Sequence, residues 1–98
     1  MYGTIARLRV KPGMVDQFRQ QNRLVAEELT AVGIAYEHIY QSDGDPNEVW
    51  LAVGFTSREA YQQNAQSAKQ HEQYTQLRAM LDADPEWHDG EVIESFTG

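Results

Sequence analysis

The feature of this chain that most constrains its fold is a strand-to-helix junction that occurs twice. The first junction lies at Val10–Met14, where Lys-Pro-Gly ends a strand pattern before a helical pattern begins, and the second lies at Phe55–Glu59. A return to a strand pattern follows each helical segment, so the 98 residues predict the order β-α-β-β-α-β. We expect one α+β domain spanning residues 1–98, with a ferredoxin-like fold. Right-handed crossovers place the four strands in an antiparallel sheet of order 4-1-3-2, with both helices on one face.

Apolar periodicity supports the elements in the first half of the chain. In residues 2–10, small and apolar side chains occupy alternate positions, which indicates a strand with one inner face. In residues 15–32, apolar side chains recur every three or four positions, as in an amphipathic helix, and Gly33 stands where a left-handed cap belongs. Residues 34–41 and 48–55 are rich in aromatic and β-branched residues and flank a run of turn formers, so they predict an antiparallel hairpin.

The second half of the chain predicts an interrupted helix and a short last strand. Thr56 and Glu59 have the spacing of a capping box, so we expect Thr56 to cap the start of the helix. The middle of this helix is polar, and a break is expected near Ser67–Ala68. A turn at Asp84–Gly90 then leads into the last strand, at Glu91–Phe96.

Composition limits the classes of protein to which this chain can belong. The chain has no cysteine, which excludes disulfides and thiolate chemistry, and its net charge of −7 argues against a nucleic-acid partner. No apolar run is long enough to span a membrane, and residues 1–7 lack the apolar segment of a signal peptide. We therefore expect a cytoplasmic protein that binds neither nucleic acid nor membrane.

Charge is distributed unevenly along the chain. Basic residues gather in the first quarter, whereas residues 82–94 carry six acidic side chains and no Lys or Arg. The acidic end is either a docking surface or the neighbour of the basic end within the sheet. The predicted strand order favours the second interpretation, with Arg7 and Arg9 beside Glu91 and Glu94.

One face of the predicted sheet has no helix to cover it. Two helices cover only one side of the strands, yet the other side carries Ile5 together with either Trp50 or its neighbours Leu51 and Val53. An exposed apolar face of this size is typical of an interface. We expect a homodimer with two-fold symmetry, in which the uncovered faces of two sheets pack together.

The three histidines, His38, His71 and His88, do not have the spacing of a metal site, and we expect none. Because a histidine titrates near neutral pH, His38 or His71 could accept a proton from a phenolic substrate. A structural role is the alternative for each. Tyr36, His38 and Tyr40 share one face of the second strand, and alternation alone does not say whether this face meets the helices or a dimer partner.

Polar side chains are expected on the helix face that meets the sheet. Asn64, His71 and Tyr74 lie along this face, opposite the small Thr4 and Ala6 of the first strand. The pattern predicts either an incompletely filled space that holds a small molecule or a set of polar groups that hydrogen-bond one another.

Three segments resemble the antibiotic biosynthesis monooxygenase (ABM) domain family. They are residues 4–13, Asp45–Asn47 and residues 55–61, and the resemblance covers nearly the whole chain. The ending Asp84–Gly90 is similar to that of a subgroup of small ABM-domain proteins. The resemblance implies a dimeric α+β barrel with a ligand cavity between sheet and helices. It also implies oxidation of aromatic polyketides or quinols without metal or flavin, so no cofactor is expected; other members degrade haem or act on small signalling molecules.

The chain departs from the family pattern at several positions. Phe55 replaces a tryptophan common at the end of the third strand, and Asn64 replaces a histidine common in the second helix. The three groups that haem-degrading members use correspond to Ala6, Asn64 and Tyr74, and none of them matches. Haem degradation is therefore not expected.

Two functions of different classes remain. The first is a cofactor-independent monooxygenase that acts on a small aromatic or quinol-like compound in a cavity between sheet and helices. Its expected site residues are catalytic His38 and His71 and ligand-binding Asn64, Tyr74, Phe55, Tyr36 and Tyr40. The second is a non-catalytic dimer of the same fold that binds a small ligand or serves a structural role. A cavity reached by a histidine together with Asn64 favours the first function, and a core filled by aromatic side chains favours the second.

Overall fold

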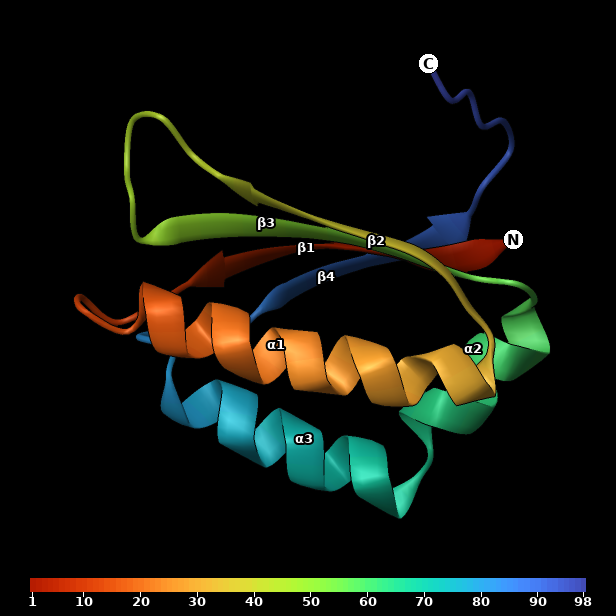
Figure 1. Cartoon of the computed structure of the whole chain (residues 1–98), viewed down its shortest axis with the longest axis horizontal. Helices are drawn as coiled ribbons and strands as arrows, with labels where there is room; N and C mark the ends of the chain where they lie inside the picture. Colours follow the sequence, from red (N-terminus) through yellow and green to blue (C-terminus); the bar gives the residue numbers. More distant parts are fainter.

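The computed structural model describes residues 1–98, and its elements follow the predicted order with one helix divided into two. They are β1 (Tyr2–Arg9), α1 (Val15–Leu29), the 3-10 turn η1 (Thr30–Val32), β2 (Ile34–Gln41), β3 (Glu48–Phe55), α2 (Arg58–Ala65), α3 (Ala68–Ala79) and β4 (Glu86–Glu91). The four strands form one antiparallel sheet of order β2-β3-β1-β4, which confirms the predicted order read from the other edge. All three helices lie on one side of the sheet, and its other side is uncovered (Figure 1). None of these helices combines the length and apolar composition needed to cross a bilayer.

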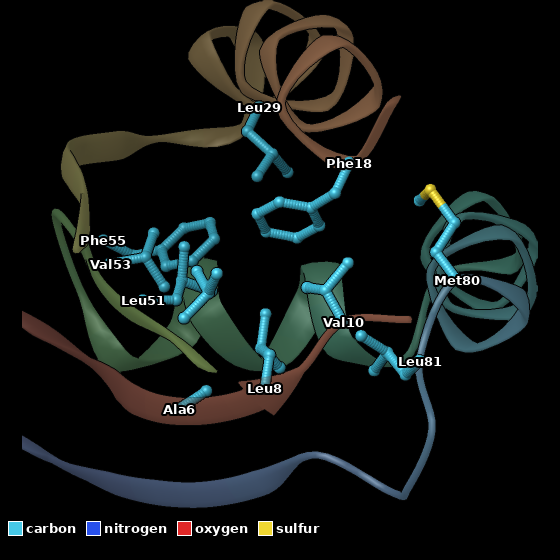
Figure 2. Close-up of a cluster of buried hydrophobic side chains, with 11 residues drawn as sticks. Ala6, Leu8, Val10, Phe18, Leu29, Leu51, Val53, Phe55, Met80 and Leu81 are labelled. Carbon is cyan, nitrogen blue, oxygen red and sulfur yellow. The ribbon is translucent and has the colours of Figure 1, made fainter. Parts of the chain in front are cut away.

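The core lies between the sheet and α1. Alternate residues of β1 and β3 point toward the helices, and each strand contributes its apolar set to that face. Figure 2 shows these side chains pointing toward the ring of Phe18 from α1, with Met80 and Leu81 closing the cluster after α3. The buried apolar residues are Ala6, Leu8, Val10, Phe18, Leu29, Val49, Leu51, Val53, Phe55, Met80 and Leu81.

A β-bulge near the start of β2 decides which side chains of that strand face the helices. Ile34 pairs with Phe55 and Tyr36 pairs with the next residue of β3, Gly54, so that Ala35 is the extra residue. Ile34 packs against the core, but the extra residue reverses the alternation beyond it. Tyr36 and its successors at alternate positions therefore point away from the helices. The ring of Tyr36 lies so close to the backbone of Gly54 that a Cβ there would come within 2.2 Å of it.

The helix ends follow the predicted signals at two of three places. Gly33 has φ of 99° and ends η1 in the left-handed conformation, as predicted. The predicted break is confirmed, since Ser67 caps a new helix by accepting a hydrogen bond from the backbone N–H of Gln70 at 3.0 Å. The prediction that Thr56 caps α2 is wrong. Ser57 is extended and accepts a hydrogen bond from the backbone N–H of Ala60 instead, so the helix starts one residue later.

The last strand was predicted at Glu91–Phe96, which is wrong, because β4 ends where that prediction begins. Leu81 forms a bridge with Val10, and the backbone N–H of Asp82 donates to the carbonyl of Arg9 at 2.8 Å. These contacts bring the chain to the end of β1 directly after α3. Pairing with β1 therefore starts at Glu86, several residues before the predicted position.

The register of β4 also changes the partners of the β1 arginines, which were predicted beside Glu91 and Glu94. Arg7 is paired instead with Glu48 at 2.9 Å and with Glu86 at 3.4 Å. Glu86 is the residue opposite Arg7 in the β1–β4 register, whereas Glu91 lies opposite the other end of β1. Of the acidic residues in 82–94, only Glu86 therefore pairs with a β1 arginine, and the other partners come from β3 and the turn before it.

Glu48 is the centre of this outer-face network. Its carboxylate accepts hydrogen bonds from the Trp50 indole at 3.0 Å, from Arg7 at 2.9 Å and from the Ser42 hydroxyl at 2.9 Å. Arg9 approaches the same carboxylate at 3.6 Å and contacts Asp45 at 3.0 Å. The bonds from Trp50, Arg7 and Ser42 lower the pKa of Glu48 to about 2.

The first prediction tests the core assignment with a pair of leucines. Leu8 is fully buried in β1, whereas Leu24 on α1 is 58% exposed. Leu8→Ala is expected to lower the free energy of unfolding by about 2–5 kcal/mol, and Leu24→Ala by less than about 0.5 kcal/mol. Urea denaturation at a fixed protein concentration measures both. Equal losses in the two variants would contradict the placement of the core.

The second prediction concerns acid stability. The pKa of Glu48 is about 2 in the folded protein and 4.5 for an ordinary glutamate. The ionised carboxylate therefore stabilises the folded state at neutral pH, and this stabilisation is lost as the pH falls from about 4.5 toward 2. Glu48→Gln is therefore expected to have a lower urea midpoint than the wild type at pH 7, and the difference should shrink below pH 4.5. Glu72→Gln, which changes an exposed residue of α3, is the control. A difference that stays constant across this pH range would show that ionisation of Glu48 contributes nothing.

Candidate functional site

A cavity of about 410 Å³ lies between the inner face of the sheet and the helices. Helix α3 is held at its ends, by Ser67 at its start and by buried Met80 and Leu81 after it, yet no residue of α3 itself is buried. The facing strand β1 offers the small side chain of Thr4 at this point. Because neither layer fills the space, a hollow remains with walls from all four strands, α1, α2 and α3.

Four of the predicted site residues line this cavity. Phe55 contributes to the wall from β3, Asn64 from α2, and His71 and Tyr74 from α3. The break at Ser67 places Asn64 and His71 on separate helices that face the same space. Asn64 and Tyr74 are half-buried, whereas His71, on α3, is exposed.

Three predicted site residues lie elsewhere. Tyr36, His38 and Tyr40 pair with outward-pointing positions of β3, so they face away from the cavity on the uncovered side of the sheet. The rings of Tyr36 and His38 stack there, with centroids 5.8 Å apart. The structure thus answers the question of which face of β2 carries His38: it is the face opposite the helices.

A carboxyl group from β2 stands in the cavity wall. Glu37 points inward, next to Val53 in the strand register, and its Oε1 accepts a hydrogen bond from the Asn22 amide of α1 at 2.7 Å. Burial raises the pKa of Glu37, and the bond from Asn22 opposes part of this rise. The cavity therefore contains a fixed carboxyl group that is easier to protonate than an exposed glutamate.

A second polar pair lies where α2 meets β4. The Tyr61 hydroxyl donates to Asp89 at 2.8 Å, and both residues line the cavity. Burial, together with the hydrogen bond and charge of Asp89, raises the pKa of Tyr61 well above its ordinary value, so the phenol stays protonated at neutral pH. The rings of Tyr2 and Phe55 pack edge-on against Tyr61 at 5.1 and 5.6 Å between centroids. These contacts hold Tyr61 in place as a donor.

Two buried polar atoms of the wall have no hydrogen-bond partner. They are the hydroxyl of Thr4 and the amide oxygen of Gln73, whose Nε2 donates to Glu28 at 2.7 Å. The side chain of Asn64 makes only a long contact, from its amide nitrogen to Gln70 at 3.4 Å. Buried polar groups without partners are uncommon, and a bound molecule or water in the cavity can satisfy them.

Sequence analysis missed Glu37, Tyr61 and Asp89. The inward position of Glu37 could not be predicted, because the bulge at Ala35 reverses which side chains of β2 point inward. Asp89 was assigned to a turn, but it lies in β4. Tyr61 carried a usable signal, since it precedes Asn64 by three residues and so lies on the same helix face.

No group of three or more His, Asp or Glu side chains is arranged to hold a metal ion. The polar groups of the cavity are instead donors and acceptors suited to an organic molecule: two carboxyl groups, two phenols, amides and an imidazole. Apolar side chains make up most of the remaining wall, as in sites that enclose small aromatic or aliphatic molecules.

Comparison with solved structures shows which proteins share this fold. A conserved protein from Methanosarcina mazei Go1 is 21% identical, with a TM-score of 0.80 over 91% of this chain and 89% of that chain. A candidate antibiotic biosynthesis monooxygenase from Chloroflexus aurantiacus J-10-fl is 21% identical, with a TM-score of 0.79 over 98% and 96%. A protein named antibiotic biosynthesis monooxygenase is 15% identical, with a TM-score of 0.77 over 96% and 100%. At these identities the likeness shows the fold alone.

The sequence itself identifies the family. No curated protein matches the chain. The family model described as antibiotic biosynthesis monooxygenase matches residues 1–80, which include both strand-to-helix junctions and every cavity residue except those of β4. The chain therefore belongs to the antibiotic biosynthesis monooxygenase family.

Proposed function

We propose that this protein is a monooxygenase that oxidises a small aromatic or quinol-like compound in the cavity without a cofactor. The observation that carries the proposal is the cavity itself, of about 410 Å³, in a chain of this family. A volume of this size suits a small organic ligand, and its wall combines apolar side chains with a few polar groups that orient such a ligand. His71 and Asn64 reach the same space, which is the arrangement that favours an enzyme over a filled core.

The proposed chemistry uses the substrate as the reductant. A phenolic or quinol-like compound loses a proton, and its electron-rich carbon reacts with O₂ to form a peroxide. Loss of water from the peroxide leaves a carbonyl, so one oxygen atom stays on the product and the other leaves as water. Asn64 and Tyr74 bind the substrate oxygen and stabilise its negative charge, and Phe55 packs against the ring. Of the two histidines in the sequence-based proposal, His71 has access to this cavity.

A non-catalytic ligand-binding or structural dimer is the second candidate function. The observation that favours it is that several polar groups of the wall already pair with one another, as Asn22 does with Glu37 and Tyr61 with Asp89. Such pairs rigidify a fold without any chemistry. Oxygen consumption separates the two functions, because only the enzyme consumes it.

We also propose that two chains associate through the uncovered face of the sheet. Ile5 is 53% exposed and Tyr40 is 60% exposed on this face, where Trp50 lies opposite Arg7. Packing two such faces together removes this apolar surface from water. A cytoplasmic location and the absence of a nucleic-acid or membrane partner remain predictions from composition.

The third prediction tests catalysis. The wild-type protein is expected to consume oxygen with at least one compound from a panel of hydroquinones and polycyclic phenols, measured with an oxygen electrode. Heat-denatured protein is the control for spontaneous oxidation. Uptake no faster than this control for every compound would contradict the monooxygenase and favour the non-catalytic dimer.

Tyr74→Phe tests the site within the same assay. Loss of the hydroxyl is expected to lower kcat/KM by roughly 10- to 100-fold, since a hydrogen bond to a charged oxygen contributes about 1.5–3 kcal/mol. Thr75→Ala on the same helix is the matched control, because Thr75 is exposed and donates only to the carbonyl of His71. Equal rates in the two variants would show that the Tyr74 hydroxyl does not bind the substrate oxygen.

The fourth prediction tests the dimer. The wild-type protein is expected to elute at twice the chain mass in size-exclusion chromatography with light scattering. Ile5→Asp places a charge on the uncovered face and is expected to shift the population toward monomer. Leu24→Asp is the control, because Leu24 is equally exposed but lies on α1. A monomeric wild type, or a dimer that only Leu24→Asp disrupts, would contradict this interface.

A further inference from the structure

We propose that Glu37 is a catalytic residue of the cavity, whose carboxylate accepts the proton of a phenolic hydroxyl on the bound substrate. The inference rests on the proposed function and narrows it, since it requires a substrate with an ionisable hydroxyl group. It assigns the proton acceptor to a strand residue rather than to His71.

The position of Glu37 is set by the sheet. The bulge at Ala35 turns Glu37 to the inner face of the sheet, and pairing with Val53 fixes its position along the strand. Asn22 on α1 holds Oε1 at 2.7 Å, which orients the carboxyl group. Oε2 makes no hydrogen bond to the protein and is not enclosed, so it is free to receive a ligand donor.

No charged neighbour neutralises this carboxyl group. From α1, Asp16, Arg19 and Arg23 share a second hollow with Glu37, while His71 and Tyr74 face it from α3 across the main cavity. Tyr61 and Asp89 line the same cavity from α2 and β4. Glu37 forms an ion pair with none of these groups. Its negative charge is therefore stabilised by one amide alone and destabilised by burial, which favours accepting a proton.

The raised pKa of Glu37 acts in the same direction. Burial is its main cause, and the Asn22 hydrogen bond opposes it. A base whose pKa moves toward the working pH accepts a proton more readily in the transition state. His71 is exposed and has no hydrogen-bonded partner for its ring, so its side chain is less well oriented.

The proton transfer is balanced within the site. The substrate O–H bond breaks and its electron pair stays on the substrate oxygen, while a new O–H bond forms on Oε2 of Glu37. The negative charge moves from Glu37 to the substrate, which can then give electrons to O₂, the oxidant of the proposed function. The proton on Glu37 returns to the outer oxygen of the peroxide. As the O–O bond breaks, the oxygenated carbon loses its hydrogen as a second proton, and its C–H electron pair forms the new carbonyl. The outer oxygen takes up both protons and leaves as water.

The fifth prediction is tested first by binding, which needs no turnover. 4-Nitrophenol is the probe, because its neutral and ionised forms absorb at different wavelengths. The wild type is expected to bind the neutral form, with Kd rising as the pH passes through the probe's own pKa, since the phenolate is repelled by Glu37. Glu37→Gln keeps the shape and the Asn22 contact but not the charge. It is expected to bind the neutral probe about tenfold more weakly and to lose most of the pH dependence.

Turnover gives a second readout. Glu37→Gln is expected to lower kcat by roughly 10²-fold or more, as for loss of a general base. His71→Gln is expected to have a smaller effect. Asn22→Ala removes the bond that lowers the pKa of Glu37, so the acidic limb of its kcat–pH profile should move to higher pH. Glu72→Gln, at an exposed position of α3, should match the wild type in every assay.

The outcomes separate this inference from the proposed function. Wild-type activity with unchanged binding, rate and pH profile in Glu37→Gln would overturn the role of Glu37 and leave the monooxygenase standing. A wild type that binds no phenol and consumes no oxygen would overturn both. Circular dichroism of each variant establishes that it is folded before either conclusion is drawn.

Discussion

The single extra residue in β2 is the constraint on which the two faces of this protein depend. Ile34 packs against the core and Glu37 lies in the cavity wall, although an uninterrupted strand would place them on opposite faces. The bulge at Ala35 lets both residues face the helices, because it reverses the alternation of inward and outward side chains along β2. It sends the Tyr36–His38 stack to the uncovered side, and it brings a carboxyl group under α1. Bulges are found next to active sites because they re-aim side chains in this way.

A second constraint keeps the cavity open. Helix α3 is tied to the sheet by the backbone contacts that follow it, from Lys11 to Met80 at 2.9 Å and from Asp82 to Arg9 at 2.8 Å. These contacts fix its end, while none of its own residues is fully buried and most of them are polar. A helix that carried large apolar side chains toward Thr4 would close the space. The glutamine-rich composition of this segment, which has no use as a core, is therefore consistent with a wall around a ligand.

The sequence predicted the elements whose signals are local and missed those set by tertiary contacts. The junctions, the hairpin, the left-handed Gly33 and the break at Ser67 each depend on a few neighbouring residues. The position of β4 depends on Leu81 meeting Val10, a contact between distant parts of the chain. Of the candidate site, the helix residues were placed in one cavity, because helical spacing predicts a shared face. Phe55 of β3 was also placed correctly, but the residues of β2 were not, since one bulge exchanges the inward and outward positions of that strand.

Two polar atoms of the cavity wall find no partner within the protein. They are the hydroxyl of Thr4 and the amide oxygen of Gln73. A buried polar atom left without any partner costs about 1–3 kcal/mol, so the fold carries a need for water or a ligand at these two positions. Val at the position of Thr4 and Leu at that of Gln73 would remove it and fill part of the space. A purely structural dimer gains nothing from keeping these atoms, whereas a protein that binds a hydroxylated ligand needs donors and acceptors that its own fold does not already satisfy.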